Sequence, residues 1–167
     1  MSHYLEPDLL LAKLVSDLEP WVREQKGLLS VAADPWHFLE LLAEAPQGWR
    51  AVLHFSGDDN RMDDPDAGCW CNYRFEVGVT CQKGLSLDPE EGLYKPRPGH
   101  APALLRLVAL TRQRIRSLEF VVEGSPRHVL YRGCEPIVLP DGTPLSGYRL
   151  RFELIAHPEP IEAYRQI

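Results

Sequence analysis

A first stripe of apolar residues at three- to four-residue spacing predicts an amphipathic helix over residues 8–25. Gly27 follows as a stop signal. Pro20 lies inside this stretch, and a mid-helix proline removes a backbone hydrogen bond, so we expect a break near Glu19. The stripe comprises Leu10, Leu14, Leu18, Trp21 and Val22.

Two further helices are predicted. The first spans residues 35–45, because Asp34 suits the N-cap and Pro35 suits the first helical position. We expect its core-facing side to be Trp36, Leu39, Leu42 and Ala43, widened by Phe38 and Leu41. The second spans residues 102–117, with Leu104, Leu107, Val108, Thr111 and Ile115 on one face. Its exposed side carries Arg106, Arg112, Arg114 and Arg116. Most of these lie in the last turns, where cations suit the helix dipole.

Alternating apolar and polar residues predict the strands. They cover residues 49–55, 70–81, 118–123, 128–139 and 147–156, and a turn-rich segment at 140–144 joins the last two. In the second strand the odd positions from Cys71 to Cys81 are apolar and face one way. His54 alternates with Leu53 and Phe55, so we expect it at the surface or at a sheet edge.

These elements predict an α+β fold: a mostly antiparallel sheet of about four to five strands with helices packed on one face. At 167 residues the chain suits one domain, 1–167, with a sizeable core. It divides into an N-terminal helical segment, 5–45, a sheet with a central helix, 49–156, and a C-terminal tail, 157–167. Residues 84–102 read as a long structured loop.

Composition narrows the classes of function. The formal net charge is −6, which gives no footprint for specific nucleic-acid binding. Fourteen arginines stand against four lysines, and arginine suits ion pairs at interfaces. The apolar run Leu9–Ala12 is short and lacks a preceding basic region, so we expect no secretory signal, no membrane partner and folding in the cytoplasm.

Four cysteines, Cys69, Cys71, Cys81 and Cys134, are the best metal candidates by residue type. Cys71 and Cys81 share one face of a single strand, about 33 Å apart at the usual rise, so one ion cannot bridge them. We therefore expect both to be buried, reduced and free of metal.

The segment Ser56–Gly68 is predicted to be a long polar loop, extended and mobile when unpaired. It carries Asp58, Asp59, Arg61, Asp63, Asp64 and Asp66. Calcium-loop spacing fails, because the twelfth position from Asp64 is Phe75 instead of a glutamate. We interpret the loop as solvated or as an assembly contact.

Motifs for catalysis are missing from the sequence. It has no H-E-x-x-H pair, no G-x-S-x-G turn and neither of the common phosphate-binding glycine loops. A spatial Ser-His-Asp triad stays open, since its members need not be close in sequence. We expect no enzymatic turnover and no cofactor.

The order of elements resembles the tail terminator and minor tail, or tail-completion, proteins of long-tailed bacteriophages and prophages. The matching segments are Glu44–Val52, with its Pro-Gln-Gly-Trp start of a strand, Tyr73–Val79, the helix Leu104–Ile115, and Gly147–Phe152. The resemblance covers residues 5–156 and is one of architecture.

The resemblance implies a homohexameric ring that caps the tail tube, joins it to the head and holds no cofactor. Its partners would be tail-tube and head–tail connector proteins, in the host cytoplasm during assembly and then in the virion tail. The acidic loop and the arginine-bearing helix face would be the two complementary contact surfaces. The alternatives are a connector protein of related fold, a small cytoplasmic α+β enzyme or ligand-binding domain, and a monomeric adaptor.

Overall fold

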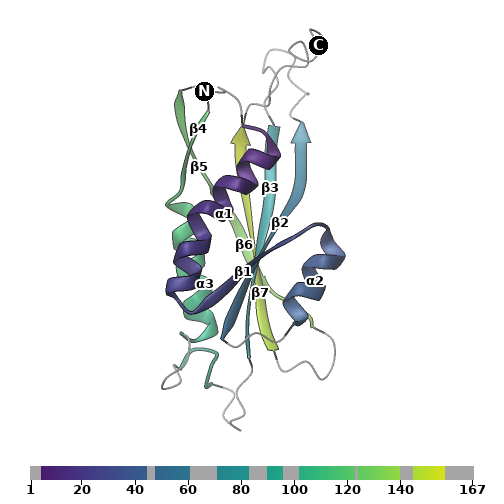
Figure 1. Ribbon diagram of the computed structural model, residues 1–167, viewed down its shortest axis with the longest axis vertical. Helices are drawn as coiled ribbons and strands as arrows, with labels where there is room; N and C mark the ends of the chain where they lie inside the picture. The colour runs from purple at the N-terminus through teal and green to yellow at the C-terminus, as the bar shows by residue number, and fades with distance from the viewer. Residues whose placement is uncertain are drawn as a thin grey trace.

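The computed structural model describes residues 5–44, 48–60, 71–82, 90–95, 102–122, 124–139 and 145–156. The helices are α1 (Pro7–Glu24), α2 (Pro35–Ala43) and α3 (Leu104–Arg116). The strands are β1 (Gly27–Ala32), β2 (Trp49–Asn60), β3 (Cys71–Gln82), β4 (Glu119–Val122), β5 (Ser125–His128), β6 (Leu130–Pro136) and β7 (Leu145–Ala156). Figure 1 shows the long strands running along the long axis, with α1 and α3 on the left and α2 on the right.

The main sheet has five strands in the order β1-β2-β3-β7-β6. Strand β1 pairs with β2 in parallel, and every other neighbouring pair is antiparallel. The expected α+β class and mostly antiparallel sheet are therefore confirmed. The parallel pair requires a crossover, and α2 supplies it, because parallel neighbours cannot be joined by a tight hairpin.

The two faces of the sheet carry different cores. Odd-numbered residues of β3, from Cys71 to Cys81, pack with α1 and α3 in the larger core. Val52 of β2 packs on the opposite face with Phe38 and Leu42 of α2. A Cβ at Gly78 of β3 would lie within 2.9 Å of both α2 side chains, so the glycine permits this close approach. The expectation that helices cover one face holds for α1 and α3 alone.

Helix α1 runs through Pro20 without a break, so the expected break near Glu19 is wrong. The proline costs about 3 kcal/mol through its lost hydrogen bond and ring clash. Each fully buried Leu or Val contributes roughly 1.5–3 kcal/mol. Four such residues, Leu10, Leu14, Leu18 and Val22, are buried along one stripe and outweigh that cost.

Helix α2 begins as expected, because Asp34 Oδ1 accepts a hydrogen bond from the His37 backbone N–H at 2.8 Å. The expected core face is only partly right. Phe38 and Leu42 are fully buried, but Trp36 is 73% exposed and Leu39 is 36% exposed. The helix rests on the sheet along a narrower stripe than its sequence suggests. In α3 four of the five expected core residues, Leu104, Leu107, Thr111 and Ile115, are buried, and Val108 is half-buried.

Three strand assignments differ from expectation. Strands β1 and β5 were not expected, and β1 takes an edge position beside β2. Strand β4 forms as expected, but it pairs with β5 in a separate two-stranded sheet instead of joining the main one. The predicted hairpin of β6 and β7 is confirmed, with Glu135 opposite Arg149.

Strand β2 continues past Phe55 to Asn60, so the predicted loop starts later than residue 56. The register shifts between Phe55 and Gly57, which is a β-bulge. Gly57 has φ +121°, a conformation that favours glycine. Beyond it, Asp58 pairs with Tyr73 and Asp59 with Asn72.

A short turn over residues 90–95 covers the start of α3. The backbone N–H groups of Leu104 and Leu105 donate to the carbonyl oxygens of Gly92 and Leu93 at 2.8 and 2.9 Å. Ala103 at the N-cap has no side-chain oxygen, so these carbonyls satisfy donors that a cap would otherwise serve. The rest of the predicted loop 84–102, apart from Pro102, and the tail 157–167 lie outside the described residues.

Candidate interaction surfaces

The acidic candidates are only partly described. Asp58 is exposed on the carboxyl-terminal end of β2, and Asp59 follows it in the same strand. Strand pairing, not a loop, therefore fixes the backbone at both positions. Arg61, Asp63, Asp64 and Asp66 lie outside the described residues, as does the expectation of a mobile loop there.

The arginine candidates lie on the exposed side of α3. Arg106, Arg112 and Arg116 line a shallow depression of about 510 Å³. None of the ion pairs formed within the described part of the chain includes these three side chains. The Arg112 guanidinium lies 5.5 Å from the centre of the Tyr131 ring, which orients it. We call Arg106, Arg112 and Arg116 the arginine face.

Arg114 lies apart from the arginine face. Its Nη2 donates to the backbone carbonyl oxygen of Asp17 at 3.3 Å, which ties α3 to α1. The structure therefore brings three of the four predicted arginines together. The carboxyl-terminal end of β2 lies at the top of Figure 1, whereas α3 lies in the lower half.

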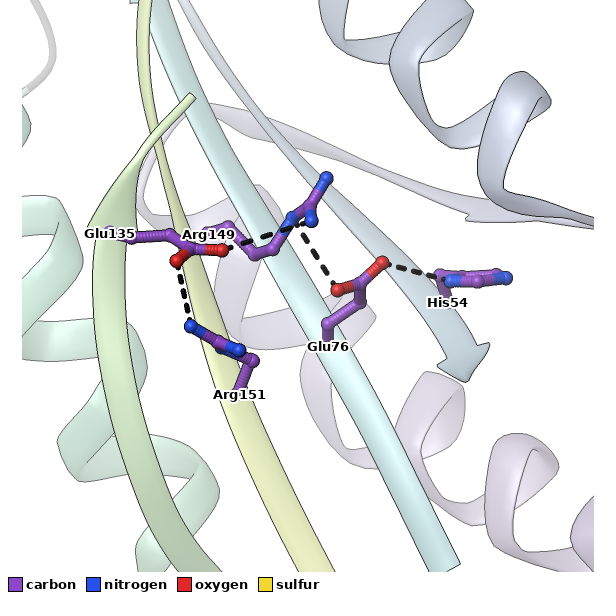
Figure 2. A network of polar contacts seen from close by, with 5 residues as sticks. All are labelled: His54, Glu76, Glu135, Arg149 and Arg151. Atoms are coloured by element: carbon purple, nitrogen blue, oxygen red, sulfur yellow. Dashed lines mark hydrogen bonds and ion pairs between the residues drawn. The ribbon is translucent and has the colours of Figure 1, made fainter. Parts of the chain in front are cut away.

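A charged network that the sequence did not single out crosses the sheet on the face where α2 packs. Figure 2 shows Glu76 of β3 between His54 and Arg149, and Glu135 of β6 between Arg149 and Arg151. His54 Nδ1 lies 3.0 Å from Glu76 Oε1, and Arg149 Nε lies 3.4 Å from Glu76 Oε2. Arg151 Nη2 donates to Glu135 Oε2 at 2.7 Å.

Burial decides what this network does. His54 is 4% exposed and Glu76 is 8% exposed, so the expectation of a surface histidine is wrong. The Phe38 ring of α2 lies 5.7 Å from the His54 ring and covers it. Both oxygens of Glu76 are engaged, which satisfies a carboxylate that would be costly to bury alone. The contact between His54 and Glu76 therefore links β2 to β3 beneath α2.

Farther along β7, Glu153 forms a second polar cluster. Arg132 Nε donates to Glu153 Oε2 at 2.6 Å. Burial alone would raise the pKa of Glu153, but hydrogen bonds from Arg132 and Asn72 and the charges of Arg132 and Arg74 outweigh it and lower the pKa. This carboxylate is therefore ionised and held in place between two arginines.

An open cavity of about 490 Å³ lies over this charged face. Arg74, Arg132, Arg149 and Arg151 line it together with Glu76 and Glu153. Alternation of charged with apolar residues in the predicted β6–β7 hairpin could have revealed the surface. This alternation is visible in the sequence, but it does not show which charged side chains form ion pairs with one another.

Cys71 and Cys81 are each 9% exposed as whole residues, which confirms the expected burial. Cys134 is exposed on β6. Within the described ranges, no group of three or more His, Cys, Asp or Glu side chains is arranged to hold a metal ion. In the same part of the chain, no helix has the length and apolar character needed to cross a membrane.

Comparison with known proteins adds no family assignment. No protein-family model matches the chain, and no curated protein sequence matches it.

Proposed function

We propose that this chain is a structural subunit that assembles head-to-tail into a ring, as a tail terminator of a long-tailed phage or prophage. In this role the ring caps the tail tube and joins it to the head. The chain would meet tail-tube and connector proteins in the host cytoplasm and remain in the virion tail. The order of elements supports the resemblance: a long N-terminal helix, a strand that begins at Trp49, a central α3 and a closing β6–β7 hairpin.

The arginine face is the observation that carries the proposal. A head-to-tail contact needs two different surfaces on one subunit, and they must complement each other. Three exposed guanidiniums without ion-pair partners in the described ranges make one such surface. The acidic end of β2, with Asp58, lies in another region of the molecule and has the opposite charge. Arginine suits such contacts because its planar fork binds carboxylates in a bidentate manner.

Charge reversal on the arginine face tests the proposal. We expect Arg106→Glu with Arg116→Glu to weaken or abolish concentration-dependent assembly, measured by light scattering and by electron microscopy of the particles. The matched control is Arg23→Glu with Lys26→Glu, which makes the same change in net charge at two exposed cations of another surface. A surface ion pair contributes about 0–1 kcal/mol, so assembly should weaken with salt and depend on several pairs together.

A second arm tests the acidic surface. Replacing Asp58, Asp59, Asp63 and Asp64 with Asn should weaken assembly and leave the fold and the Tm of the monomer nearly unchanged. Combining Asp58→Arg and Asp59→Arg with the reversed arginine face should restore assembly, because the two charges are then exchanged. The proposal is wrong if the wild type stays monomeric with purified tail-tube protein present, or if neither reversal alters assembly.

The charged cavity favours a second candidate, a ligand-binding domain for a small anion. Its volume falls in the usual range for small-molecule sites of about 300–1,000 Å³, and four arginines line it. However, Arg132, Arg149 and Arg151 already form ion pairs with glutamates of the same surface. Calorimetric titration with inorganic phosphate and with citrate distinguishes the two functions. A ligand-binding domain for small anions predicts saturable binding, whereas a ring subunit does not require any.

A further inference from the structure

The two edges of the main sheet differ in how they are protected against pairing with another strand. β6 carries the devices that natural edges use: the charged Arg132 and Glu135, Pro136 without a backbone N–H, and a register shift next to Gly133. β1 carries none of them. Its sequence, Gly-Leu-Leu-Ser-Val-Ala, has no charge and no proline, and its six pairs with β2 run without a shift.

The outer side of β1 is also accessible. Leu28 is 50% exposed and Val31 is 41% exposed, although both lie in a strand of the main sheet. Among the strands that the structure describes, only β2 pairs with β1. Within the described ranges, no other backbone hydrogen bond uses the groups of β1 that point away from β2, so they can pair with a further strand. An unprotected apolar edge of this kind is a template for pairing with another chain.

We propose that β1 pairs with β1 of a second copy of this chain, antiparallel and about a two-fold axis, to join two sheets into one. The sequence of the strand favours a second copy as the occupant. An uncharged edge meets its own copy without like-charge repulsion, whereas the protected edge at β6 opposes such pairing with its charges and its bulge.

Symmetry and side-chain direction set the register of this contact. A two-fold axis perpendicular to the sheet keeps each side chain on its own face, so opposing residues must face the same way. Leu29 packs with the α1 core and Ala32 with the α2 core, so odd and even positions of β1 take opposite faces. A two-fold axis midway between Ser30 and Ser30 of the second copy then places Leu28 opposite Ala32 of that copy. It also places Val31 opposite Leu29 of that copy. Both exposed apolar side chains of each copy thus gain apolar partners.

An axis that passes between the two Leu29 residues fits less well, because Leu28 would then lie opposite Ser30.

Pairing about Ser30 forms about four to six main-chain hydrogen bonds. A contact of this length is smaller than the usual interface of about 1,200–2,000 Å², so the dimer should be weak and reversible. The contact uses β1 and leaves the arginine face unused, so it does not rest on the proposed ring.

Cysteine crosslinking in the full chain tests the register. Ser30→Cys sets two thiols directly opposite each other, at a Cα separation of about 4.5–5.5 Å that suits a disulfide. Leu28→Cys is the matched control, since that residue lies several positions away from its own copy in the same arrangement. We expect Ser30→Cys to form a crosslinked dimer under mild oxidation, and mass spectrometry to map it to residue 30. A crosslink at Leu28→Cys in place of Ser30→Cys, or none at either, overturns the proposal.

Disruption of the edge provides a second, independent readout. In the Arg106→Glu/Arg116→Glu background, which lacks the proposed ring contact, Leu28→Lys with Val31→Lys should shift the sedimentation coefficient to that of the monomer at concentrations where the background protein dimerises. Leu130→Lys is the matched control, because Leu130 is 41% exposed on the protected edge β6. Loss of dimer in the control, or an unchanged dimer in the β1 variant, contradicts the proposal. Circular dichroism checks that each variant is folded. A Ser30→Cys crosslink that still forms in the Arg106→Glu/Arg116→Glu background shows that the β1 contact is independent of the ring contact.

Discussion

Gly78 offers a direct test of how α2 packs against the sheet. An added Cβ at this position would lie 2.7 Å from Leu42 Cδ2 and 2.9 Å from Phe38 Cζ. Real side chains do not approach so closely, so Gly78→Ala must push α2 away or force its side chains out of their rotamers. Such overpacking costs about 1–3 kcal/mol.

An opposing effect acts in the unfolded state. Replacing glycine with alanine restricts the unfolded chain and stabilises the fold by about 0.4–1 kcal/mol where the native conformation tolerates it. We therefore expect Gly78→Ala to lower the free energy of unfolding by a net amount of roughly 0.5–2 kcal/mol. For a chain of this length each kcal/mol lowers the Tm by about 2–4 °C.

A double-mutant cycle separates the clash from other causes. Leu42→Ala alone should cost about 2–5 kcal/mol, because a fully buried leucine leaves a cavity. In the Gly78→Ala/Leu42→Ala protein the new methyl group occupies part of that cavity, so the combined cost should be smaller than the sum by about 0.5–3 kcal/mol. Urea denaturation supplies the free energies. Strictly additive costs, or a Gly78→Ala protein as stable as the wild type, would show that α2 does not contact β3 here.

Three further predictions concern single polar groups. Tyr73→Phe should cost about 1–2 kcal/mol in urea denaturation, because the buried hydroxyl donates to the Leu5 carbonyl oxygen at 2.9 Å; an unchanged midpoint would show that this bond contributes nothing. Glu153 has a pKa below its ordinary value of 4.5, so its contribution to stability is complete above that pH and is lost as the pH falls below it. Glu153→Gln should therefore flatten the loss of Tm on acidification, and parallel profiles for the two proteins would contradict this. Asp34→Ala should lower the free energy of unfolding by about 1 kcal/mol through loss of the α2 cap, and Asp34→Asn should restore most of it.

Periodic segments of the sequence predicted their own structure well. Helix α3 buries four of the five residues that its spacing selected, and β3 places its odd positions in the core. These elements have one apolar stripe or one apolar face, so local pattern and tertiary burial agree. The β6–β7 hairpin also formed as expected, because two alternating segments flank a turn-rich sequence.

Features that depend on distant partners could not be predicted. Strand β1 is short and has adjacent leucines, so it shows no alternation, and its place is set by pairing with residues 49–54. The burial of His54 follows from Glu76, which is its cross-strand partner, and from Phe38, which covers it. The continuation of β2 follows from Gly57, whose positive φ places an extra residue in the strand.

The candidate surfaces divide in the same way. The arginine face was predicted from helical spacing, because residues 106, 112 and 116 share the side opposite the buried stripe. The sequence did not show that Arg114 turns towards α1, because that contact depends on how two helices far apart in the chain pack together. Nor did it show the network of Glu76, Arg149 and Glu135, which three different strands contribute.

The position of β7 has a consequence for synthesis on the ribosome. This strand is the last described element of the chain, yet it lies inside the sheet, between β3 and β6. Until residues 145–156 leave the ribosomal tunnel, the edges of β3 and β6 that pair with β7 have no partner strand. The core of the nascent chain is incomplete until then. Such distant pairing is slow and leaves a period in which aggregation competes with folding. A chain that ends before β7 would keep both edges open and would be a substrate for chaperones and proteases.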